Sequence, residues 1–322
     1  MRIAILGAAG MLGRRLTERL AAEGELAGKA ITAFTLHDIV PAARVNGNFD
    51  VDVLTSDFSD QGEAERILLY RPDVIFHLAA VVSGEAEADL EKGYRVNLEG
   101  TRALLNAVRT IGQDYRPRFV FTSSIAVFGA PLPDVIPDDY LPRPLSSYGA
   151  QKAMGELLVA DYARRGIIDG LSIRLPTICV RPGKPNKAAS SFYSSIIREP
   201  LNGEEAVLPV SRDIRHWFAS PRKAVDFLIR AAEVAGPDLT VRALTMPGVS
   251  ASVEDQIEAL RKVAGDDAVA LIREEPDPAI HMIVSSWPKS FDARLALDLG
   301  FVPDASFDEI VQIYCRDELK CG

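Results

Sequence analysis

Short apolar segments alternate with helical segments along the first half of the chain, and this alternation constrains the fold more than any other feature. Strands are predicted at residues 3–6, 31–38, 51–57, 74–78, 119–123 and 171–175, and helices at 11–22, 61–70, 96–111 and 147–165. Strands that alternate with helices of this length indicate βαβ units and a parallel sheet. We therefore expect a doubly wound α/β (Rossmann) fold, which binds its ligand at the carboxyl ends of the strands.

The pattern changes at Pro176. Prolines at 176, 182, 185, 200 and 209 interrupt it, and helices are predicted again only at 221–234, 253–263 and 291–299. We predict a nucleotide-binding Rossmann domain over residues 1–175. Residues 176–322 are expected to form mainly a smaller C-terminal lobe that binds the substrate, with some segments returning to the Rossmann domain.

The composition disfavours several kinds of partner. With 36 Lys and Arg against 45 Asp and Glu, the net charge of −9 disfavours nucleic acid, which needs a basic face. No apolar run reaches the roughly 18 residues of a membrane span. Cys179, Cys315 and Cys321 show neither metal-ligand spacing nor a disulfide framework. The sequence therefore predicts a cytoplasmic protein without a bound metal and without membrane or nucleic-acid partners.

Three glycines mark the turn after the first predicted strand. Gly7, Gly10 and Gly13 form a GxxGxxG pattern that opens the first predicted helix. Glycine lets the backbone approach a pyrophosphate closely, and the helix N-terminus supplies free N–H groups and positive potential. The pattern predicts a dinucleotide site, although a plain strand-to-helix turn also needs glycine for tight packing.

Two aspartates lie at the ends of the next two predicted strands. A carboxylate at Asp38 can accept hydrogen bonds from both hydroxyls of an adenosine ribose and would repel a 2′-phosphate, so it favours NAD over NADP. The alternative for Asp38 is a capping or loop aspartate. Asp57 and the adjacent Phe58 could border the adenine, but a turn aspartate explains Asp57 equally well.

Tyr148 and Lys152 lie four residues apart in the long predicted helix, so their side chains share a face. A free phenol has a pKa of about 10, and a nearby ammonium favours the phenolate. Such a tyrosine can take a proton from an alcohol as hydride leaves the carbon. The alternative is a surface tyrosine beside a solvated lysine. However, Ser123 and Ser124 end the preceding strand, where a hydroxyl could hold the substrate oxygen.

Together these motifs resemble the extended short-chain dehydrogenase/reductase family over nearly the whole chain. Besides the glycines, Asp38 and the Tyr148/Lys152 pair, the resemblance includes His77-Leu78-Ala79-Ala80 and Asn97. It implies that NAD is the cofactor and that backbone contacts from residues 78–80 line its groove. The expected NAD-binding residues are Gly7, Gly10, Met11, Leu12, Gly13, Asp38, Asp57, Phe58, Leu78, Ala79, Ala80, Asn97, Tyr148 and Lys152.

The same resemblance implies roles at the reacting centre. Tyr148 is the expected acid/base, and Lys152 would hold the nicotinamide ribose and tune Tyr148. Ser124 would orient the substrate oxygen, with Ser123 as the alternative. Asn97 would support the lysine and a proton-relay water. Because the family often dimerises through two helices, here 96–111 and 147–165, we also expect a homodimer.

The segment after the sixth predicted strand separates the subgroups of this family. Nucleotide-sugar enzymes usually carry an asparagine there, whereas this chain has Arg174-Leu175-Pro176-Thr177-Ile178. Segments 184–192 and 212–217 resemble a subgroup that oxidises small sugar acids, and segment 123–129 resembles short-chain L-threonine dehydrogenases. A carboxylate substrate needs a cation or a helix N-terminus. The expected substrate contacts are Ser83, Ser124, Tyr148, Lys187, Ser190 and Arg215.

The predicted function is therefore NAD-dependent oxidation of the C2 hydroxyl of a small sugar acid by hydride transfer. The nearest alternative is an NAD-dependent nucleotide-sugar 4-epimerase, which would keep the reduced cofactor and return the hydride to the other face. A cofactor-sensing regulator on the same fold is disfavoured, because such proteins often lose the tyrosine or the lysine, and this chain has both.

Overall fold

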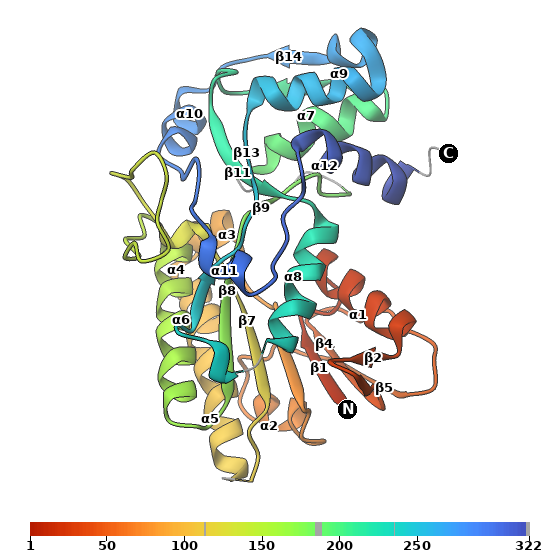
Figure 1. Cartoon of the computed structure of the whole chain (residues 1–322), viewed down its shortest axis with the longest axis vertical. Coiled ribbons are helices and arrows are strands. Elements are labelled where there is room, and N and C mark those ends of the chain that lie inside the picture. The colour runs from red at the N-terminus through yellow and green to blue at the C-terminus, as the bar shows by residue number, and fades with distance from the viewer. Residues whose placement is uncertain (113, 184–188, 235, 320–322) are drawn as a thin grey trace. The chain divides into compact units, whose positions relative to one another are not determined.

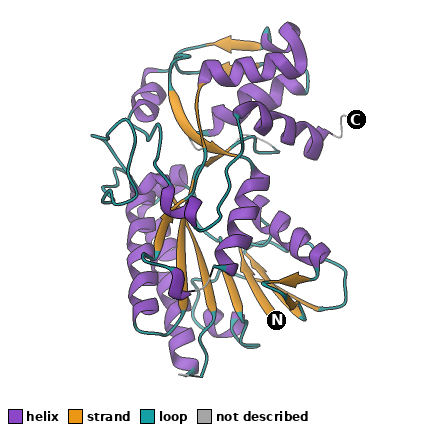
Figure 2. Cartoon of the chain, viewed as in Figure 1, coloured by secondary structure: helices purple, strands orange, loops and turns teal. Residues whose placement is uncertain are grey.

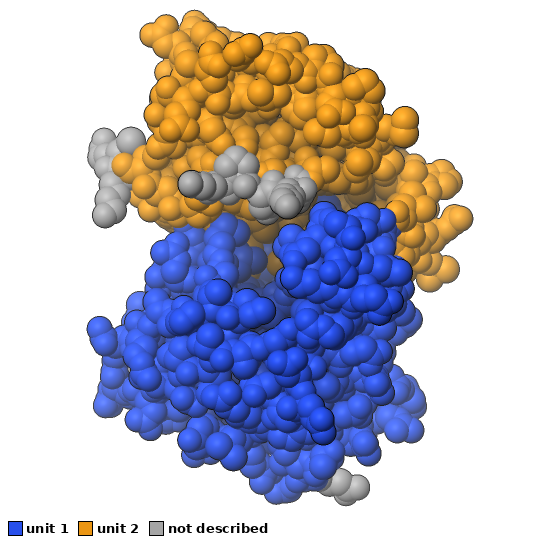
Figure 3. Space-filling view, turned by 180° about the vertical axis from the view of Figure 1, so that it is seen from behind, with its two compact units in different colours: residues 1–127, 146–174, 225–244 blue, residues 128–145, 175–224, 245–322 orange. Residues whose placement is uncertain are grey.

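The computed structural model describes residues 1–112, 114–183, 189–234 and 236–319. The chain divides into two compact units, shown in blue and orange in Figure 3. Unit 1 comprises residues 1–127, 146–174 and 225–244, and unit 2 comprises residues 128–145, 175–224 and 245–322. This division describes how the chain packs and does not test which part binds NAD or substrate, so the functional boundary expected at residue 175 stays a prediction.

Unit 1 repeats the strand–helix order expected from the sequence (Figure 2). Its strands are β1 (Arg2–Leu6), β2 (Glu25–Leu26), β3 (Lys29–Ala30), β4 (Ala33–Asp38), β5 (Asp50–Thr55), β6 (Val74–His77), β7 (Arg118–Ser124), β8 (Asp169–Leu175) and β12 (Ala243–Thr245). Its helices, wholly or in the main, are α1 (Met11–Glu23), α2 (Glu63–Ile67), α3 (Ser83–Ala88), α4 (Leu90–Gly93), α5 (Thr101–Ile111), α6 (Ser147–Arg164) and α8 (Pro221–Glu233). A π-helical segment, η1 (Tyr94–Gly100), joins α4 to α5, and short 3₁₀ turns are η2 (Ile125–Val127) and η3 (Gly236–Asp238).

The main sheet of unit 1 has seven strands in the order β12-β8-β7-β6-β1-β4-β5. Figure 1 labels five of them: β8, β7, β1, β4 and β5. From β1 the chain adds β4 and β5 on one side, and it then adds β6, β7 and β8 on the other. The parallel registers pair Leu6 with both His37 and His77, which brings three carboxyl ends to one edge. The boundary between β1 and β6 is the switch point of a doubly wound fold. The predicted Rossmann sheet is confirmed.

Burial on both faces explains why the central strands could be predicted as apolar runs. All four residues of β6 are buried, and so are four of the five residues of β1. Right-handed crossovers place helices on both faces of such a sheet. Leu104, Leu105 and Val108 of α5 recur at helical spacing and pack in one core with Phe119 of β7 and Val159 of α6.

Unit 2 combines two small sheets with five helices in the part of the chain that the structure describes. Its elements are β9 (Thr177–Ile178), α7 (Ser191–Leu201), β10 (Ala206–Leu208), β11 (Arg215–Ala219), β13 (Val249–Ser252), α9 (Val253–Val269), β14 (Ile272–Glu274), α10 (Pro278–Ser285), α11 (Arg294–Asp298), α12 (Phe307–Tyr314) and the π-helical η4 (Cys315–Leu319). The sheets are β13-β11-β9 and β10-β14. Apolar side chains of α7, α9 and α12 form the core of this unit.

Several helices differ from the sequence prediction. Helix α7 lies where no helix was predicted, because Pro200 was among the prolines expected to interrupt the pattern, whereas it falls in the last turn of α7. Helices α10 and α12 were not predicted, although a Ser306-x-x-Glu309 capping signal begins α12. Helices α2 and α11 are each only five residues long, shorter than predicted. In the described ranges, no helix is both long and apolar enough to cross a membrane.

Candidate active site

The glycine turn joins three elements of unit 1 through backbone alone. Gly7 has a φ of +86°, and the N–H groups of Gly7 and Ala8 donate to the His37 carbonyl at 2.8 and 3.0 Å. A Cβ on Gly7 would lie 2.8 Å from the backbone nitrogen of Ala79, and one on Gly13 would lie 2.7 Å from Cα of Ala8. Glycine is therefore required at Gly7 for the turn to approach the loop after β6, and at Gly13 for α1 to approach the turn.

Helix α1 begins at this turn with an open N-terminus. Its N-cap is Gly10, which offers no side-chain cap, and its first turn, which begins with Met11 and Leu12, contains no acidic residue. Unsatisfied N–H groups and the positive end of the helix dipole favour a bound phosphate. Together with the side-chain-free turn, this helix end fits the pyrophosphate of a dinucleotide.

Asp38 is tied to the glycine turn. Its Oδ2 accepts a hydrogen bond from the backbone N–H of Ala9 at 2.9 Å, and its Oδ1 accepts one from that of Ile39 at 2.7 Å. The side chain is only partly buried at the end of β4. A fixed, accessible carboxylate beside the turn is the arrangement that ribose recognition needs. Its role toward NAD remains a proposal.

Asp57 and Phe58 have other partners in the structure. The Asp57 carboxylate accepts hydrogen bonds from Ser59 and, at 2.8 Å, from the Arg95 guanidinium, which together lower the pKa of Asp57 against the opposing effect of its burial. The Phe58 ring is buried and packs edge-to-face against His77. The adenine contacts expected of these two residues remain untested, and the Phe58 ring is held by the core.

Tyr148 and Lys152 extend from the start of α6, where Ser146 caps the helix by accepting the Gly149 N–H. The Lys152 ammonium is buried and lies 5.7 Å from the centroid of the Tyr148 ring. It donates to the carbonyl oxygen of Thr122 at 2.8 Å. Burial lowers the pKa of Lys152 to about 7, while the nearby Glu156 carboxylate acts to raise it. The ammonium thus lies beside the Tyr148 ring, and its effect on the phenol remains a proposal.

The two serines at the end of β7 differ in their surroundings. Ser124 is partly exposed, and its hydroxyl oxygen accepts the Ala126 N–H at 3.1 Å, so its own O–H remains able to donate. Ser123 is buried and donates its hydroxyl to Glu156 at 2.5 Å. These surroundings support Ser124, rather than Ser123, as the hydroxyl that meets a substrate.

Asn97 lies in the π-helical segment η1 and is buried. Its Oδ1 accepts the Val81 N–H at 2.8 Å, and its Nδ2 donates to the Val81 carbonyl at 3.0 Å and to Gln151 Oε1 at 2.7 Å. Asn97 therefore connects the loop after β6 to the residue that precedes Lys152. In the same loop, Leu78, Ala79 and Ala80 are partly exposed, and Ala79 lies against Gly7.

Two site residues escaped the sequence analysis. Glu156 lies four residues after Lys152, and Arg174 is the penultimate residue of β8. Their side chains form a buried ion pair at 2.8 Å. The spacing of Tyr148, Lys152 and Glu156 along one helix face was a signal that could have revealed Glu156. Arg174 gave no local signal, since only the parallel sheet brings β8 beside α6.

The expected substrate contacts are distributed over both units. Ser83 begins α3 in unit 1, and Lys187 lies outside the described residues. In unit 2 the exposed Arg215 guanidinium donates to Asp255 at 3.0 Å and to the Ser250 carbonyl. Ser190 accepts a hydrogen bond from Arg181 at 3.1 Å. Arg181 was not singled out from the sequence.

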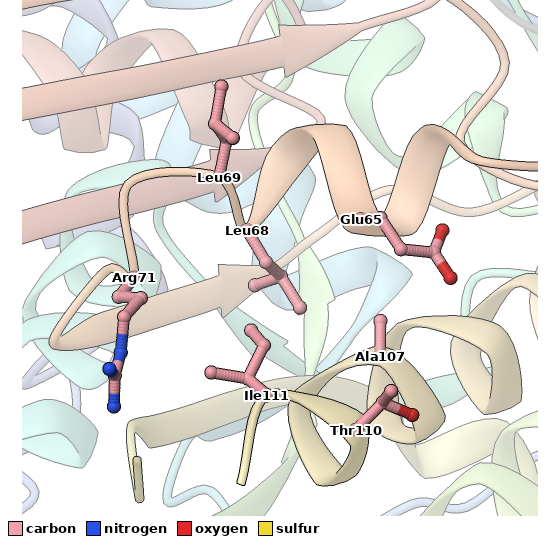
Figure 4. A pocket seen from close by; sticks show the side chains of 7 residues that line it. All are labelled: Glu65, Leu68, Leu69, Arg71, Ala107, Thr110 and Ile111. Carbon is pink, nitrogen blue, oxygen red and sulfur yellow. The ribbon is translucent and has the colours of Figure 1, made fainter. Parts of the chain in front are cut away.

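A pocket of about 330 Å³ opens elsewhere in unit 1, between α2 and α5 (Figure 4). Its walls are formed mainly by apolar side chains, with Glu65 and Thr110 at one side, and its lining residues are Glu65, Leu68, Leu69, Arg71, Ala107, Thr110 and Ile111. Residues 68–71 lead into the amino end of β6. The pocket therefore lies away from the carboxyl edge that carries the predicted site, and it contains none of the predicted site residues.

Comparison with known families decides the assignment. The profile of the NAD-dependent epimerase/dehydratase family matches residues 3–240. The chain belongs to this family. The resemblance expected from the glycine turn and the Tyr148/Lys152 pair is confirmed, and NAD is the cofactor.

Two curated relatives extend over the full chain. One is a D-erythronate dehydrogenase of Cupriavidus necator, 47% identical over 98% of this chain and 98% of that protein. The other is a D-erythronate dehydrogenase of Haemophilus influenzae, 42% identical over 99% of this chain and 100% of that protein. With its family, this similarity identifies the chain as an NAD-dependent oxidoreductase.

Solved structures agree on the fold. The crystal structure of a nucleoside-diphosphate-sugar epimerase from Agrobacterium tumefaciens is 57% identical and matches 100% of this chain and 95% of that one with a TM-score of 0.97. An L-threonine dehydrogenase from Cupriavidus necator in its holo form is 23% identical and matches 98% of this chain and 99% of that one with a TM-score of 0.85. The second likeness shows the fold alone.

Proposed function

We propose that this chain oxidises the C2 hydroxyl of a small sugar acid, with D-erythronate as substrate and 2-dehydro-D-erythronate as product. The observation that carries the proposal is the cluster of Tyr148, Lys152 and Ser124 around the end of β7. Full-length relatives named D-erythronate dehydrogenase support the choice of substrate. The chemistry is oxidation at a CH–OH group.

Cofactor binding is proposed to use the carboxyl edge of unit 1. The turn from Gly7 to Gly13 would hold the pyrophosphate, because it has no side chains in the way and opens an uncapped helix. Asp38 would accept hydrogen bonds from the adenosine ribose. Its negative charge beside the turn would repel a 2′-phosphate, so we expect a preference for NAD.

Proton transfer is proposed to pass through Tyr148. Ser124 and Tyr148 hold the C2 hydroxyl oxygen by hydrogen bonds, and Tyr148 takes the hydroxyl proton. Lys152 favours the phenolate form of Tyr148 through its charge at 5.7 Å from the ring centroid. When bound, NAD supplies the acceptor for the hydride that leaves C2. Proton and hydride together account for the two hydrogens lost from the alcohol.

The carboxylate of the substrate needs a cation or strong hydrogen-bond donors. Lys187, Ser190 and Arg215 remain the proposed contacts, and Arg181 joins them because its guanidinium is already bonded to Ser190. Arg215 is ion-paired with Asp255 at 3.0 Å, so a substrate would have to compete with that carboxylate. Arg181 is engaged as well, since its Nε donates to the Ile178 carbonyl oxygen at 3.0 Å and its Nη2 to Ser190 at 3.1 Å.

One observation favours a second function. The Agrobacterium tumefaciens structure, 57% identical to this chain, is named a nucleoside-diphosphate-sugar epimerase. An epimerase would use the same tyrosine and lysine but would end each cycle with oxidised cofactor. The experiment that separates the two follows free NADH during turnover. Accumulation over many turnovers supports the dehydrogenase, whereas conversion of a UDP-sugar without accumulation supports the epimerase.

A homodimer is also proposed, through α5 and α6. The side chain of Leu157 on α6 is 71% exposed, which is unusual for a leucine in the middle of a long helix. A second copy that covers α6 would bury it. The residues that carry the chemistry, Tyr148 and Lys152, lie on a different part of the same helix.

A further inference from the structure

The carboxylate of Glu156 joins three elements of unit 1 beneath the predicted site. It accepts the Ser123 hydroxyl at the end of β7 at 2.5 Å. It also accepts two hydrogen bonds from the Arg174 guanidinium of β8, from Nε to Oε1 at 3.0 Å and from Nη2 to Oε2 at 2.8 Å. All three residues are at most 6% exposed. A bidentate, charge-assisted contact of this kind fixes position as well as distance.

The position of Ser123 connects this carboxylate to the chemistry. The carbonyl oxygen of Thr122, which precedes Ser123, accepts a hydrogen bond from the Lys152 ammonium at 2.8 Å. Ser124, which follows Ser123, provides the hydroxyl proposed to hold the substrate oxygen. Glu156 itself lies one helical turn beyond Lys152. The Glu156 carboxylate therefore holds β7 at Ser123, between the Thr122 carbonyl and the Ser124 hydroxyl. Glu156 lies on α6, the helix that also carries Tyr148 and Lys152.

We propose that Glu156 is a positioning residue for the proton transfer: it holds α6 on the end of β7, so that the Lys152 ammonium and the Ser124 hydroxyl keep their places. The inference rests on the proposed roles of Tyr148, Lys152 and Ser124. It assigns to the Glu156–Arg174 pair a function beyond stability of the fold.

The charges around Lys152 agree with this role. Among the groups that the structure describes, Tyr148 and Glu156 face Lys152 from α6, and His77 faces it from β6. Burial lowers the pKa of His77 to about 3, so this ring is neutral near pH 7. Arg174 meets Glu156 from β8. Glu156 is the negative group that acts to raise the pKa of Lys152 against burial, so its loss should let Lys152 deprotonate at lower pH.

The test uses a double variant, Glu156→Gln with Arg174→Gln. Changing both partners avoids leaving a buried charge without a partner, which would destabilise the folded protein strongly. The titration of Lys152 is followed by NMR in full-length protein labelled with ¹³C-lysine, and its signal is assigned by its loss in Lys152→Met. Loss of the Glu156 charge lowers the Lys152 midpoint and loss of the Arg174 charge raises it. Because Glu156 is the charge that acts most on Lys152, we expect a net fall in the midpoint, of at most about one pH unit.

The matched control is Asp169→Asn. It removes the carboxylate that pairs with Arg118 at 3.0 Å and with Arg242 at 2.9 Å at the amino ends of β7 and β8, whereas Lys152 meets the carboxyl end of β7. We expect this variant to melt at a lower temperature with the Lys152 midpoint unchanged. A purely stabilising role for Glu156 predicts the same behaviour in the double variant, so an unmoved midpoint there contradicts the charge part of the inference.

Ser123→Ala tests the positioning part and remains decisive if the double variant does not fold. It keeps every charge and removes only the hydrogen bond from β7 to Glu156. We expect kcat to fall about tenfold with the KM for NAD unchanged, since a small displacement of reacting groups is costly. A kcat within twofold of the parent would overturn this part. The NMR titration needs no substrate, so its result stands whether or not Tyr148 proves to be the base.

Discussion

The Lys152 ammonium donates a hydrogen bond to the Thr122 carbonyl oxygen at 2.8 Å, although the lysine is only 2% exposed. This bond crosses from α6 to the carboxyl end of β7. It connects the helix that carries Tyr148 to the strand that ends in Ser124. We therefore expect changes in these residues to affect turnover before they affect the binding of NAD.

Tyr148→Phe should reduce kcat by roughly 10²–10⁴-fold, the usual range for loss of a general base. The ring remains, so its packing against the core is kept, and NAD binding should change by less than a few-fold. Turnover and the Kd for NAD, from fluorescence titration, measure the two effects separately.

Tyr162→Phe is the matched control for that variant. Tyr162 lies on the same helix and donates its hydroxyl to Asn106 at 2.6 Å, far along α6 from Lys152. We expect near-normal kcat. Equal losses in the two variants would mean that a phenol anywhere on α6 matters for folding, and Tyr148 would lose its assigned role.

Asp38→Asn should weaken the discrimination between NAD and NADP. The substitution keeps the size of the side chain and removes the charge that would repel a 2′-phosphate. We expect the ratio of kcat/KM for NAD to that for NADP to fall at least tenfold, on the order of one lost charge interaction. An unchanged ratio would show that Asp38 serves only to accept the Ala9 and Ile39 N–H groups.

Gly13→Ala should destabilise the protein and abolish NAD binding, because its Cβ would lie 2.7 Å from Cα of Ala8 and would push α1 away from the turn. Gly10→Ala is the control, since its Cβ would meet only the Gly7 carbonyl oxygen, at 3.2 Å. The melting temperature, measured without NAD, should fall much further in the first variant. Similar values in both would contradict the packing described for the turn.

The buried Lys152 should make stability depend on pH. Burial lowers its pKa from 10.5 to about 7. Between pH 7 and pH 10.5 the unfolded chain binds more protons than the folded one, so this group makes the stability rise with pH. Below about pH 7 the destabilisation caused by burying the ammonium is complete. Lys152→Met should therefore raise the melting temperature of the NAD-free protein more at pH 6 than at pH 9. An equal change at both pH values would show that the ammonium is not desolvated in the folded state.

The sheet could be predicted because strands that are buried on both faces appear in the sequence as continuous apolar runs. Residues 74–77 are an unbroken buried run, and so is most of β1. Unit 2 was harder. Its α7 contains Pro200, which a local reading treats as a helix end, and only the core that α7 forms with α9 and α12 shows that the helix continues to Leu201.

The candidate site divides in the same way. Tyr148 and Lys152 are four residues apart on one helix, so their proximity is local and could be predicted. The partners of Glu156 are not local: Ser123 comes from β7 and Arg174 from β8, and only the order of the parallel sheet brings them to one carboxylate. The bond between Arg95 and Asp57 is equally long-range, and no spacing in the sequence indicated it.

The most direct test of the proposed function is NADH formation from NAD and D-erythronate by the purified protein, followed at the absorbance band of the reduced nicotinamide. The proposed dehydrogenase predicts a steady rise that continues far beyond one NADH per active site. L-Threonine is expected to give a much slower rise, if any. Absence of a rise with D-erythronate and other four-carbon acids, combined with interconversion of UDP-sugars, would contradict the proposal and establish the epimerase instead.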